Sequence, residues 1–96
     1  MALVISPGME QKLSKKVPPV SRDEIVQCFA NRTGIYLYDT REKHRSDPPT
    51  QWFISLTDFG RKLKVVFMHK DGNIYLRTAY TPKPTEIAIY SKYGEL

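Results

Sequence analysis

Cysteine, long apolar runs and metal-ligand motifs are scarce or absent in this 96-residue chain, and each absence narrows its class. A single cysteine, Cys28, excludes an internal disulfide and fits a reducing cytosol. No apolar run approaches the roughly 20 residues of a membrane span, and residues 1–5 lack the charged start of a signal peptide. The sequence also has no Cys or His pair at metal-ligand spacing, phosphate-binding glycine loop, nucleophile elbow or obvious seat for paired carboxylates. We therefore expect a cytoplasmic protein without metal or cofactor.

The charge balance is basic. Fifteen Lys and Arg oppose ten Asp and Glu, which gives a net charge of +5. A length of 96 residues fits one domain, residues 1–96. A small basic domain favours an acidic partner such as nucleic acid, an acidic protein or anionic lipid. The alternative is that the positive charge serves solubility alone.

The most informative stretch runs from Gln51 to Tyr80, where three runs rich in aromatic and β-branched residues alternate with turn signals. Asp71-Gly72 between two such runs is a strong hairpin signal, because both residues tolerate positive φ. The pattern predicts a three-stranded antiparallel meander over 51–57, 62–69 and 73–80.

Turn lengths extend this prediction to the register. A two-residue turn at Asp71-Gly72 places Phe67 opposite Leu76 and Val66 opposite Arg77, and a two- or four-residue connection around Phe59-Gly60 places Ile54 opposite Val65. One face is then nearly all apolar: Trp52, Ile54, Leu56, Leu63, Val65, Phe67, His69, Ile74, Leu76, Thr78 and Tyr80. The other mixes cations, hydroxyls and rings: Gln51, Phe53, Ser55, Thr57, Lys62, Lys64, Val66, Met68, Tyr75, Arg77 and Ala79. A slip of one residue would exchange the two sets.

The remaining segments complete an α+β fold. Ser21 followed by Glu24 is a capping box and marks a clear helix start. We expect a strand at 2–6, helices at 9–16, 21–31 and 84–93, a fourth meander strand at 34–39 and a polar loop at 40–50. The order β-α-α-β-β-β-β-α predicts a mostly antiparallel sheet of four to five strands with helices packed on one face.

The mixed face suggests RNA chemistry. Cleavage without metal needs the 2′-hydroxyl activated, fixed cations at the phosphate and a proton for the leaving oxygen. Lys64 and Arg77 could clamp a phosphate, Tyr75 and Phe53 could stack bases, and His44 or a tyrosine could move the proton. The plainer interpretations are a solvated sheet face and, for the 40–50 loop that carries His44, a solvated surface loop.

With these residues in view, the chain resembles the RelE/ParE superfamily of bacterial type II toxins, closest to its BrnT-like branch, from about Lys12 to Tyr90. The resemblance rests on these motifs: Val20-Ser21-x-x-Glu24, Asp39 with a loop bearing His44, Thr57-Asp58-x-Gly60-Arg61-x-Leu63-x-Val65-Val66, Ile74-x-Leu76-Arg77-Thr78-Ala79-Tyr80 and Glu86-x-x-x-Tyr90. It implies a small endoribonuclease held inactive by an antitoxin. The catalytic residues that it implies are His44, Arg61, Lys64, Arg77 and Tyr90. The RNA-binding residues that we expect are Lys62, Tyr75, Phe53, Arg45 and Tyr80; BrnT-like proteins often carry a basic residue where Tyr80 stands.

Three functions remain open at this point. The chain could be a toxin that cleaves RNA, free or on the ribosome, with a cognate antitoxin as its protein partner and no membrane role. It could be a non-catalytic interaction module of the same fold. It could also be an RNA- or DNA-binding domain with no toxic role.

Overall fold

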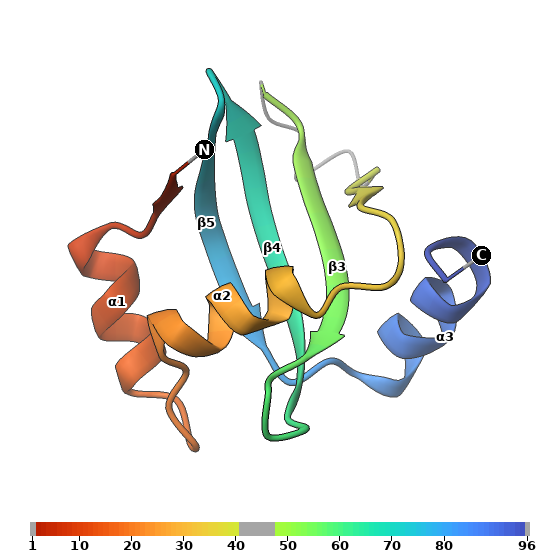
Figure 1. The fold of residues 1–96 in the computed structure, drawn as a ribbon, viewed down its shortest axis with the longest axis horizontal. Coiled ribbons are helices and arrows are strands. Elements are labelled where there is room, and N and C mark those ends of the chain that lie inside the picture. Colours follow the sequence, from red (N-terminus) through yellow and green to blue (C-terminus); the bar gives the residue numbers. More distant parts are fainter. Residues whose placement is uncertain (1, 41–47, 96) are drawn as a thin grey trace.

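The computed structural model describes residues 2–40 and 48–95. Along these residues the chain forms β1 (Leu3–Val4), α1 (Pro7–Ser14), α2 (Arg22–Ala30), β2 (Leu37–Tyr38), β3 (Thr50–Leu56), β4 (Lys62–Lys70), β5 (Asn73–Tyr80) and α3 (Pro84–Tyr93) (Figure 1). This confirms the predicted α+β class and the order β-α-α-β-β-β-β-α. Among these elements no helix is long and apolar enough to cross a bilayer.

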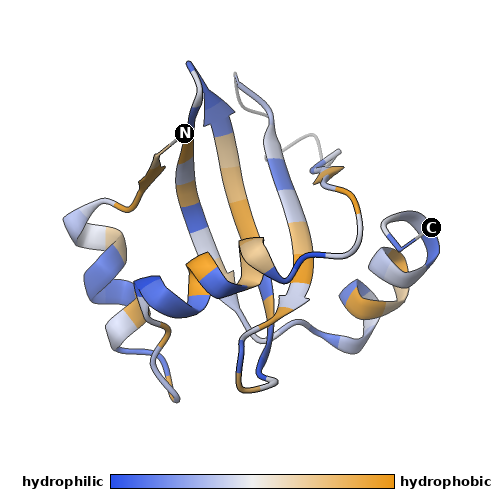
Figure 2. Cartoon of the chain, in the orientation of Figure 1, coloured by the Kyte–Doolittle hydropathy of each residue, from blue (hydrophilic) through white to orange (hydrophobic). Residues whose placement is uncertain are grey.

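The sheet has five strands in the order β1-β5-β4-β3-β2, with β1 parallel to β5 and the other pairs antiparallel. Helix α2 crosses one face of the sheet in front of β4, and α1 lies beside β5 (Figure 1). The hydrophobic segments of the central strands lie behind α2, whereas much of α1 and α2 themselves is hydrophilic (Figure 2). Helices α1 and α2 therefore cover the apolar sheet face, as expected.

The core under α2 is built on aromatic rings. Phe29 of α2 lies with its ring centroid 4.8 Å from that of Phe53 and 5.4 Å from that of Phe67. Tyr36 contacts the same two rings at 5.5 and 5.0 Å. Phe53 and Phe67 are 0% and 1% exposed, so these tilted and edge-on contacts fix α2 against β3 and β4. Burial of Cys28 raises the pKa of its thiol to about 11, which fits an inert packing role.

The predicted strand at 34–39 is shorter than expected, and only Leu37 and Tyr38 pair with β3. The backbone just before them is held by the end of α3 instead. Ile35 donates its N–H to the Gly94 carbonyl at 2.9 Å, and its own carbonyl accepts from the Tyr90 hydroxyl at 2.8 Å. These bonds satisfy Ile35 without a sheet partner, which is why the strand begins late.

The β4–β5 hairpin follows the prediction up to its middle. Asp71 and Gly72 have φ values of 53° and 80°, and Phe67 pairs with Leu76 as expected. Beyond that pair a bulge shifts the register, so that Val66 pairs with Thr78. The predicted pairing of Val66 with Arg77 is therefore wrong, because Arg77 is the extra residue of the bulge and lies exposed between its neighbours.

The β3–β4 register is also wrong by one residue. Phe53, not Ile54, pairs with Val65, and Ile54 pairs with Lys64. The cause is the odd loop length: Gly60, at a φ of 84°, donates to the Thr57 carbonyl at 2.9 Å, and Thr57 in turn bonds Arg61. Three residues, 58–60, thus connect the last bonded pair, a hairpin type with one residue in the left-handed region.

This slip exchanges the two faces of β3. The face under α2 carries Phe53, Ser55, Leu63, Val65, Phe67, Ile74, Leu76 and Ala79. The opposite face carries Trp52, Ile54, Lys62, Lys64, Val66, Met68, Tyr75, Thr78 and Tyr80. The β4 residues and Tyr75 therefore lie on the faces that the sequence predicted, and the β3 residues, Thr78, Ala79 and Tyr80 do not.

Arg61 clamps the β3–β4 hairpin to the segment between α1 and α2. Its guanidinium donates to the carbonyls of Pro18 and Pro19 at 2.8 and 2.7 Å and to both Glu24 oxygens at 3.2 Å. The Arg61 side chain is 21% exposed, so these bonds are partly shielded from water. Glu24 is the residue that also completes the α2 cap, so the clamp joins the helix start to the hairpin.

Replacement of Ser21 tests the helix start. Its hydroxyl accepts the Glu24 N–H at 3.1 Å while the Glu24 carboxylate accepts the Ser21 N–H at 3.1 Å. We expect Ser21→Ala to lower the free energy of unfolding by roughly 1 kcal/mol in urea denaturation. Ser91→Ala, an exposed site inside α3, is the matched control and should change little. Equal effects of the two substitutions would contradict the cap.

Replacement of Arg61 tests the clamp. We expect Arg61→Ala to lower the free energy of unfolding by about 2–3 kcal/mol, because the half-buried Glu24 carboxylate and the carbonyls of Pro18 and Pro19 all lose a charged donor. Arg61→Lys should recover only part of this, since an ammonium cannot reproduce the fork. Arg77→Ala, which removes an exposed arginine, should stay within about 0.5 kcal/mol of the parent. An Arg61→Ala protein as stable as the Arg77→Ala protein would rule out the clamp.

Candidate functional site

The site is built where α3 returns to the sheet on the side opposite Phe53. Pro82 is buried in the link after β5, and Pro84 starts α3 with a fixed φ. The ring of Tyr90 then packs at a centroid distance of 5.7 Å from that of Trp52 on β3. Since Trp52 and Phe53 are successive strand residues, α3 contacts the sheet face that α2 leaves uncovered.

A lysine, a carboxylate and a phenol meet at this contact. Lys64 Nζ of β4 lies 2.5 Å from Glu86 Oε2 of α3, and the Tyr80 hydroxyl of β5 donates to the same oxygen at 2.7 Å. The other Glu86 oxygen accepts the Lys83 backbone N–H at 2.9 Å. Lys64 Nζ also lies 4.4 Å from the centroid of the Trp52 ring, a cation–π contact. We call these four side chains, Trp52, Lys64, Tyr80 and Glu86, the Lys64 cluster.

Electrostatics fixes the charge state of the carboxylate. Burial alone would raise the pKa of Glu86, but hydrogen bonds from Lys64, the Lys83 backbone and Tyr80 outweigh it and lower the pKa from 4.5 to about 2. Lys64 is only 7% exposed. A cation at that depth needs its counter-charge, so Glu86 holds Lys64 in place as much as the reverse.

An open pocket of about 540 Å³ reaches the Lys64 cluster. Its lining combines rings, aliphatic side chains and charges: Leu37, Tyr38, Asp39, Thr40, Trp52, Lys64, Glu86, Ile89 and Tyr93. Tyr38 and Tyr93 are 59% and 54% exposed, so their rings are free to contact a ligand at the rim. A pocket with an apolar lining and a few charged groups is the usual form of a small binding site.

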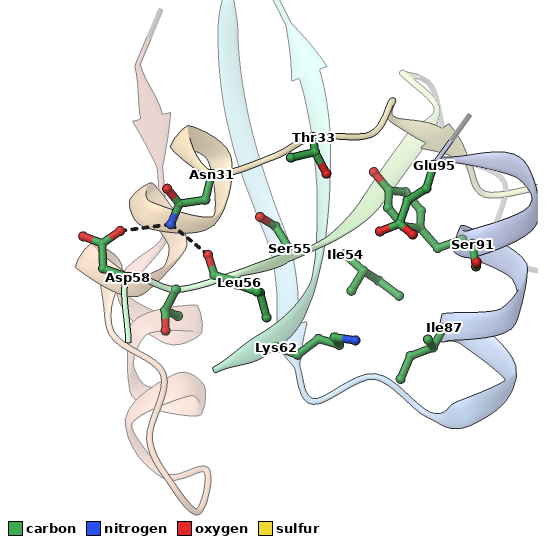
Figure 3. Close-up of a pocket in the computed structure, with 12 residues that line it drawn as sticks. Asn31, Thr33, Ile54, Ser55, Leu56, Asp58, Lys62, Ile87, Ser91 and Glu95 are labelled. Carbon is green, nitrogen blue, oxygen red and sulfur yellow. Dashed lines mark hydrogen bonds between the residues drawn. The ribbon is translucent and has the colours of Figure 1, made fainter. Parts of the chain in front are cut away.

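A second hollow of about 760 Å³ lies between the end of α2, the outer edge of β3 and α3 (Figure 3). In it Asn31 donates to the Leu56 carbonyl at 3.0 Å and to Asp58 at 2.9 Å. These bonds already occupy the polar groups at its α2 end. Among the interactions of the described residues, none joins a cation to a carboxylate within this hollow, so the Lys64 cluster is the stronger candidate site.

Three of the predicted site residues are structural. Tyr90 is 1% exposed and its hydroxyl donates to the Ile35 carbonyl. Burial raises its pKa, and its ring lies so close to Gly34 and Gly94 that a Cβ at either position would collide with it. Phe53, expected to stack a base, is fully buried against Phe29. Arg61 is engaged in the clamp described above.

The structure brings other predicted residues to the same sheet face as the Lys64 cluster. Lys62 is exposed, Tyr75 is half-buried, and both lie on the face opposite α2. Tyr80 belongs to the cluster itself. Arg77 is exposed on the bulge, one residue before Thr78. His44 and Arg45 lie outside the described residues.

Sequence reasoning missed Glu86 and Trp52. Glu86 stands in the Glu86-x-x-x-Tyr90 motif, but only the tyrosine was assigned a role. Because Glu86 lies three residues after Lys83, its carboxylate is expected to bind the backbone at the start of α3. That role gives no sign that Glu86 also binds Lys64. Trp52 was placed on the covered face by the one-residue slip. Among the described residues no group of three or more His, Cys, Asp or Glu could hold a metal ion. The Lys64 cluster itself contains a cation, an ionised carboxylate and a phenol.

The low pKa of Glu86 predicts an acid-dependent stability. Below its usual 4.5 the carboxyl of the unfolded chain binds a proton, whereas the folded state resists this down to about 2. The contribution is therefore complete above about pH 4.5 and lost as pH falls toward 2. We expect Glu86→Gln to lower the free energy of unfolding by about 2–3 kcal/mol at neutral pH. This difference in stability between parent and variant should shrink as the pH falls from about 4.5 to about 2.

Denaturant unfolding at several pH values measures this gap. Glu95→Gln, which removes the same charge from an exposed position, is the control and should give a small gap at every pH. A gap for Glu86→Gln that stays constant from neutral pH to pH 2 would contradict the linkage.

Comparisons with known proteins give no family for this chain. No family model matches it, and neither does any curated protein or solved structure. Function is therefore inferred from the chain's own residues and from the geometry of the Lys64 cluster.

Proposed function

We propose that the chain is a cytoplasmic, metal-independent endoribonuclease that acts as the toxin of a toxin–antitoxin pair. The observation that carries the proposal is the Lys64 cluster: a carboxylate held ionised, a lysine in contact with it and a phenol on the same oxygen, at the wall of an open pocket. The resemblance of the sequence to the RelE/ParE superfamily and the net charge of +5 support the same proposal.

The cluster supplies the groups that RNA cleavage needs. The Glu86 carboxylate takes the proton of a ribose 2′-hydroxyl, and the 2′-oxygen attacks the adjacent phosphorus. The Lys64 ammonium stabilises the added negative charge and gives a proton to the departing 5′-oxygen. The products are a 2′,3′-cyclic phosphate and a 5′-hydroxyl. The proton then returns from Glu86 to Lys64 across their 2.5 Å contact, which restores the starting state.

The surroundings of the cluster suit a polynucleotide. Exposed rings at Tyr38 and Tyr93 can stack unpaired bases at the pocket rim. Arg77 and Lys62 are exposed and can contact phosphates, where an arginine offers a planar fork. These exposed cations set affinity and register, whereas the half-buried pair carries the chemistry.

The protein partner of such a toxin is an antitoxin with acidic character. A cover over the open sheet face would meet Lys62 and Arg77, and displacement of α3 would separate Glu86 from Lys64. Either arrangement would stop the reaction, because the first blocks RNA and the second dismantles the cluster. Charge complementarity of this kind mainly speeds encounter.

One observation favours a second candidate function, a non-catalytic protein-interaction or RNA-binding module. The charge of Lys64 is already neutralised by Glu86, so the cation expected to hold a phosphate has a partner of its own. In that case the cluster serves only to hold α3, and RNA or protein binds elsewhere on the basic surface. Binding without cleavage is the result that this second function predicts.

Cleavage of purified RNA and of messenger RNA on ribosomes tests the proposal. We expect the parent protein to cut RNA with cyclic phosphate ends and to spare substrates whose 2′-hydroxyl is replaced by hydrogen. Glu86→Gln should lower the cleavage rate by about two to three orders of magnitude, because the base is lost. Arg77→Ala should lower it by roughly tenfold, mainly through KM, because an exposed cation binds substrate in water.

Glu95→Gln is the matched control, and all variants are compared under conditions where circular dichroism shows the native fold. Cleavage at the parent rate by folded Glu86→Gln would rule out this assignment of the base. A parent protein that binds RNA in a salt-sensitive way but never cuts it would favour the second function.

A further inference from the structure

Two loops at one end of the molecule each expose an apolar side chain almost completely. Val17, between α1 and α2, is 98% exposed, and Phe59, at the tip of the β3–β4 hairpin, is 96% exposed. Both loops project beyond the same end of the sheet (Figure 1). Neither side chain belongs to the buried core, so the Phe59 ring is available to contact a partner.

The two loops are held together. Arg61, which directly follows the hairpin loop, donates to the Pro18 and Pro19 carbonyls that directly follow Val17. Gly60 at positive φ and its bond to Thr57 fix the hairpin tip itself. The tips are therefore presented on a braced support, which lowers the entropy cost of binding through them.

The charges around the tips are mostly positive. Lys15 and Lys16 precede Val17, Lys62 follows the hairpin loop, and Lys12 is exposed on the last turn of α1. Two carboxylates lie nearby, and each already has a donor: Asp58 accepts from Asn31, and Glu24 accepts from Arg61. Lysines on two braced loops, one of which exposes a ring, fit a single-stranded nucleic acid platform, in which the ring stacks a base and the cations follow the backbone.

We infer that Phe59 and its flanking lysines form a second RNA contact, which stacks one unpaired base of single-stranded RNA on the Phe59 ring. The inference deepens the proposed function and rests on it for the identity of the ligand. The contact lies at the end of the sheet where β3 extends beyond the pocket. It would therefore hold the RNA strand outside the cleavage site and set the direction in which the RNA runs. Insertion of the tip into a membrane is the less favoured source of binding, because Asp58 next to Phe59 would enter an anionic, low-dielectric layer.

Binding of fluorescein-labelled oligo(A) RNA, measured by fluorescence anisotropy over a salt series, tests the inference. We expect Phe59→Ala to weaken binding by about tenfold, as loss of one stacked base requires. Phe59→Leu should weaken it nearly as much, because leucine keeps apolar bulk but has no ring. Lys15→Ala should weaken binding and reduce the salt slope. Lys70→Ala, which removes an exposed lysine from the other end of β4, should do neither.

The outcomes separate this inference from the proposed function. If the parent binds and cuts RNA but Phe59→Ala binds as well as the parent, the second contact is wrong and the nuclease stands. If the parent binds through Phe59 but never cuts, the nuclease is wrong and the contact stands. Parent-like binding by Phe59→Leu would replace stacking by a plain apolar contact and overturn the inference. Pelleting with vesicles containing phosphatidylglycerol, without RNA binding, would overturn it in favour of a membrane.

Discussion

The burial of one lysine governs the architecture of this protein. Lys64 emerges from the middle sheet strand and is only 7% exposed, in a position where a charge without a partner would be strongly unfavourable. The counter-charge comes from Glu86, a residue on the helix that follows all five strands in the sequence. The ion pair therefore determines where α3 docks. With α3 docked there, Tyr90 packs on Trp52 and donates a hydrogen bond to the Ile35 carbonyl just before β2. Residues of α3 then line one side of the pocket beside β2.

The β3 residues that share a face with that lysine depend on the length of the β3–β4 loop, which the sequence predicted wrongly, whereas it predicted the β4–β5 turn correctly. The Asp71-Gly72 turn has one strongly preferred geometry, and the pairs next to it were predicted correctly. The Thr57–Arg61 connection allows loops of even or odd length with similar residues, and the odd one forms. Composition could not decide between them, because Trp52-Phe53-Ile54 is apolar at every position and either face of β3 could be buried. The bulge at Arg77 has no residue signal of its own, since no glycine or proline marks it.

The candidate site shows a different limit. The candidate cations were identified in the sequence, but the carboxylates that bind them were not. Glu24 and Glu86 lie far from Arg61 and Lys64 in the sequence and meet them only in the folded structure. Arg61 and Lys64 lie three residues apart, and the family resemblance implied a catalytic role for both. In the folded chain the Arg61 guanidinium donates its hydrogen bonds to two carbonyls and to Glu24, whereas Lys64 lines a pocket. A basic residue in a sequence motif thus identifies a place where a negative group is needed, and that group can belong to the protein itself.

This double use of charge has a consequence for how the protein could be controlled. In the proposed reaction a proton crosses the same Lys64–Glu86 contact that anchors α3, so activity would depend on the docking of the last helix. Any ligand that moves α3 by even a few ångströms separates the base from the cation, and the uncompensated charge on Lys64 then favours a new anion in place of Glu86. An acidic protein segment could supply that anion. Inhibition would then require no contact with the RNA-binding surface, because the energy that holds the helix and the energy that prepares the site come from one ion pair.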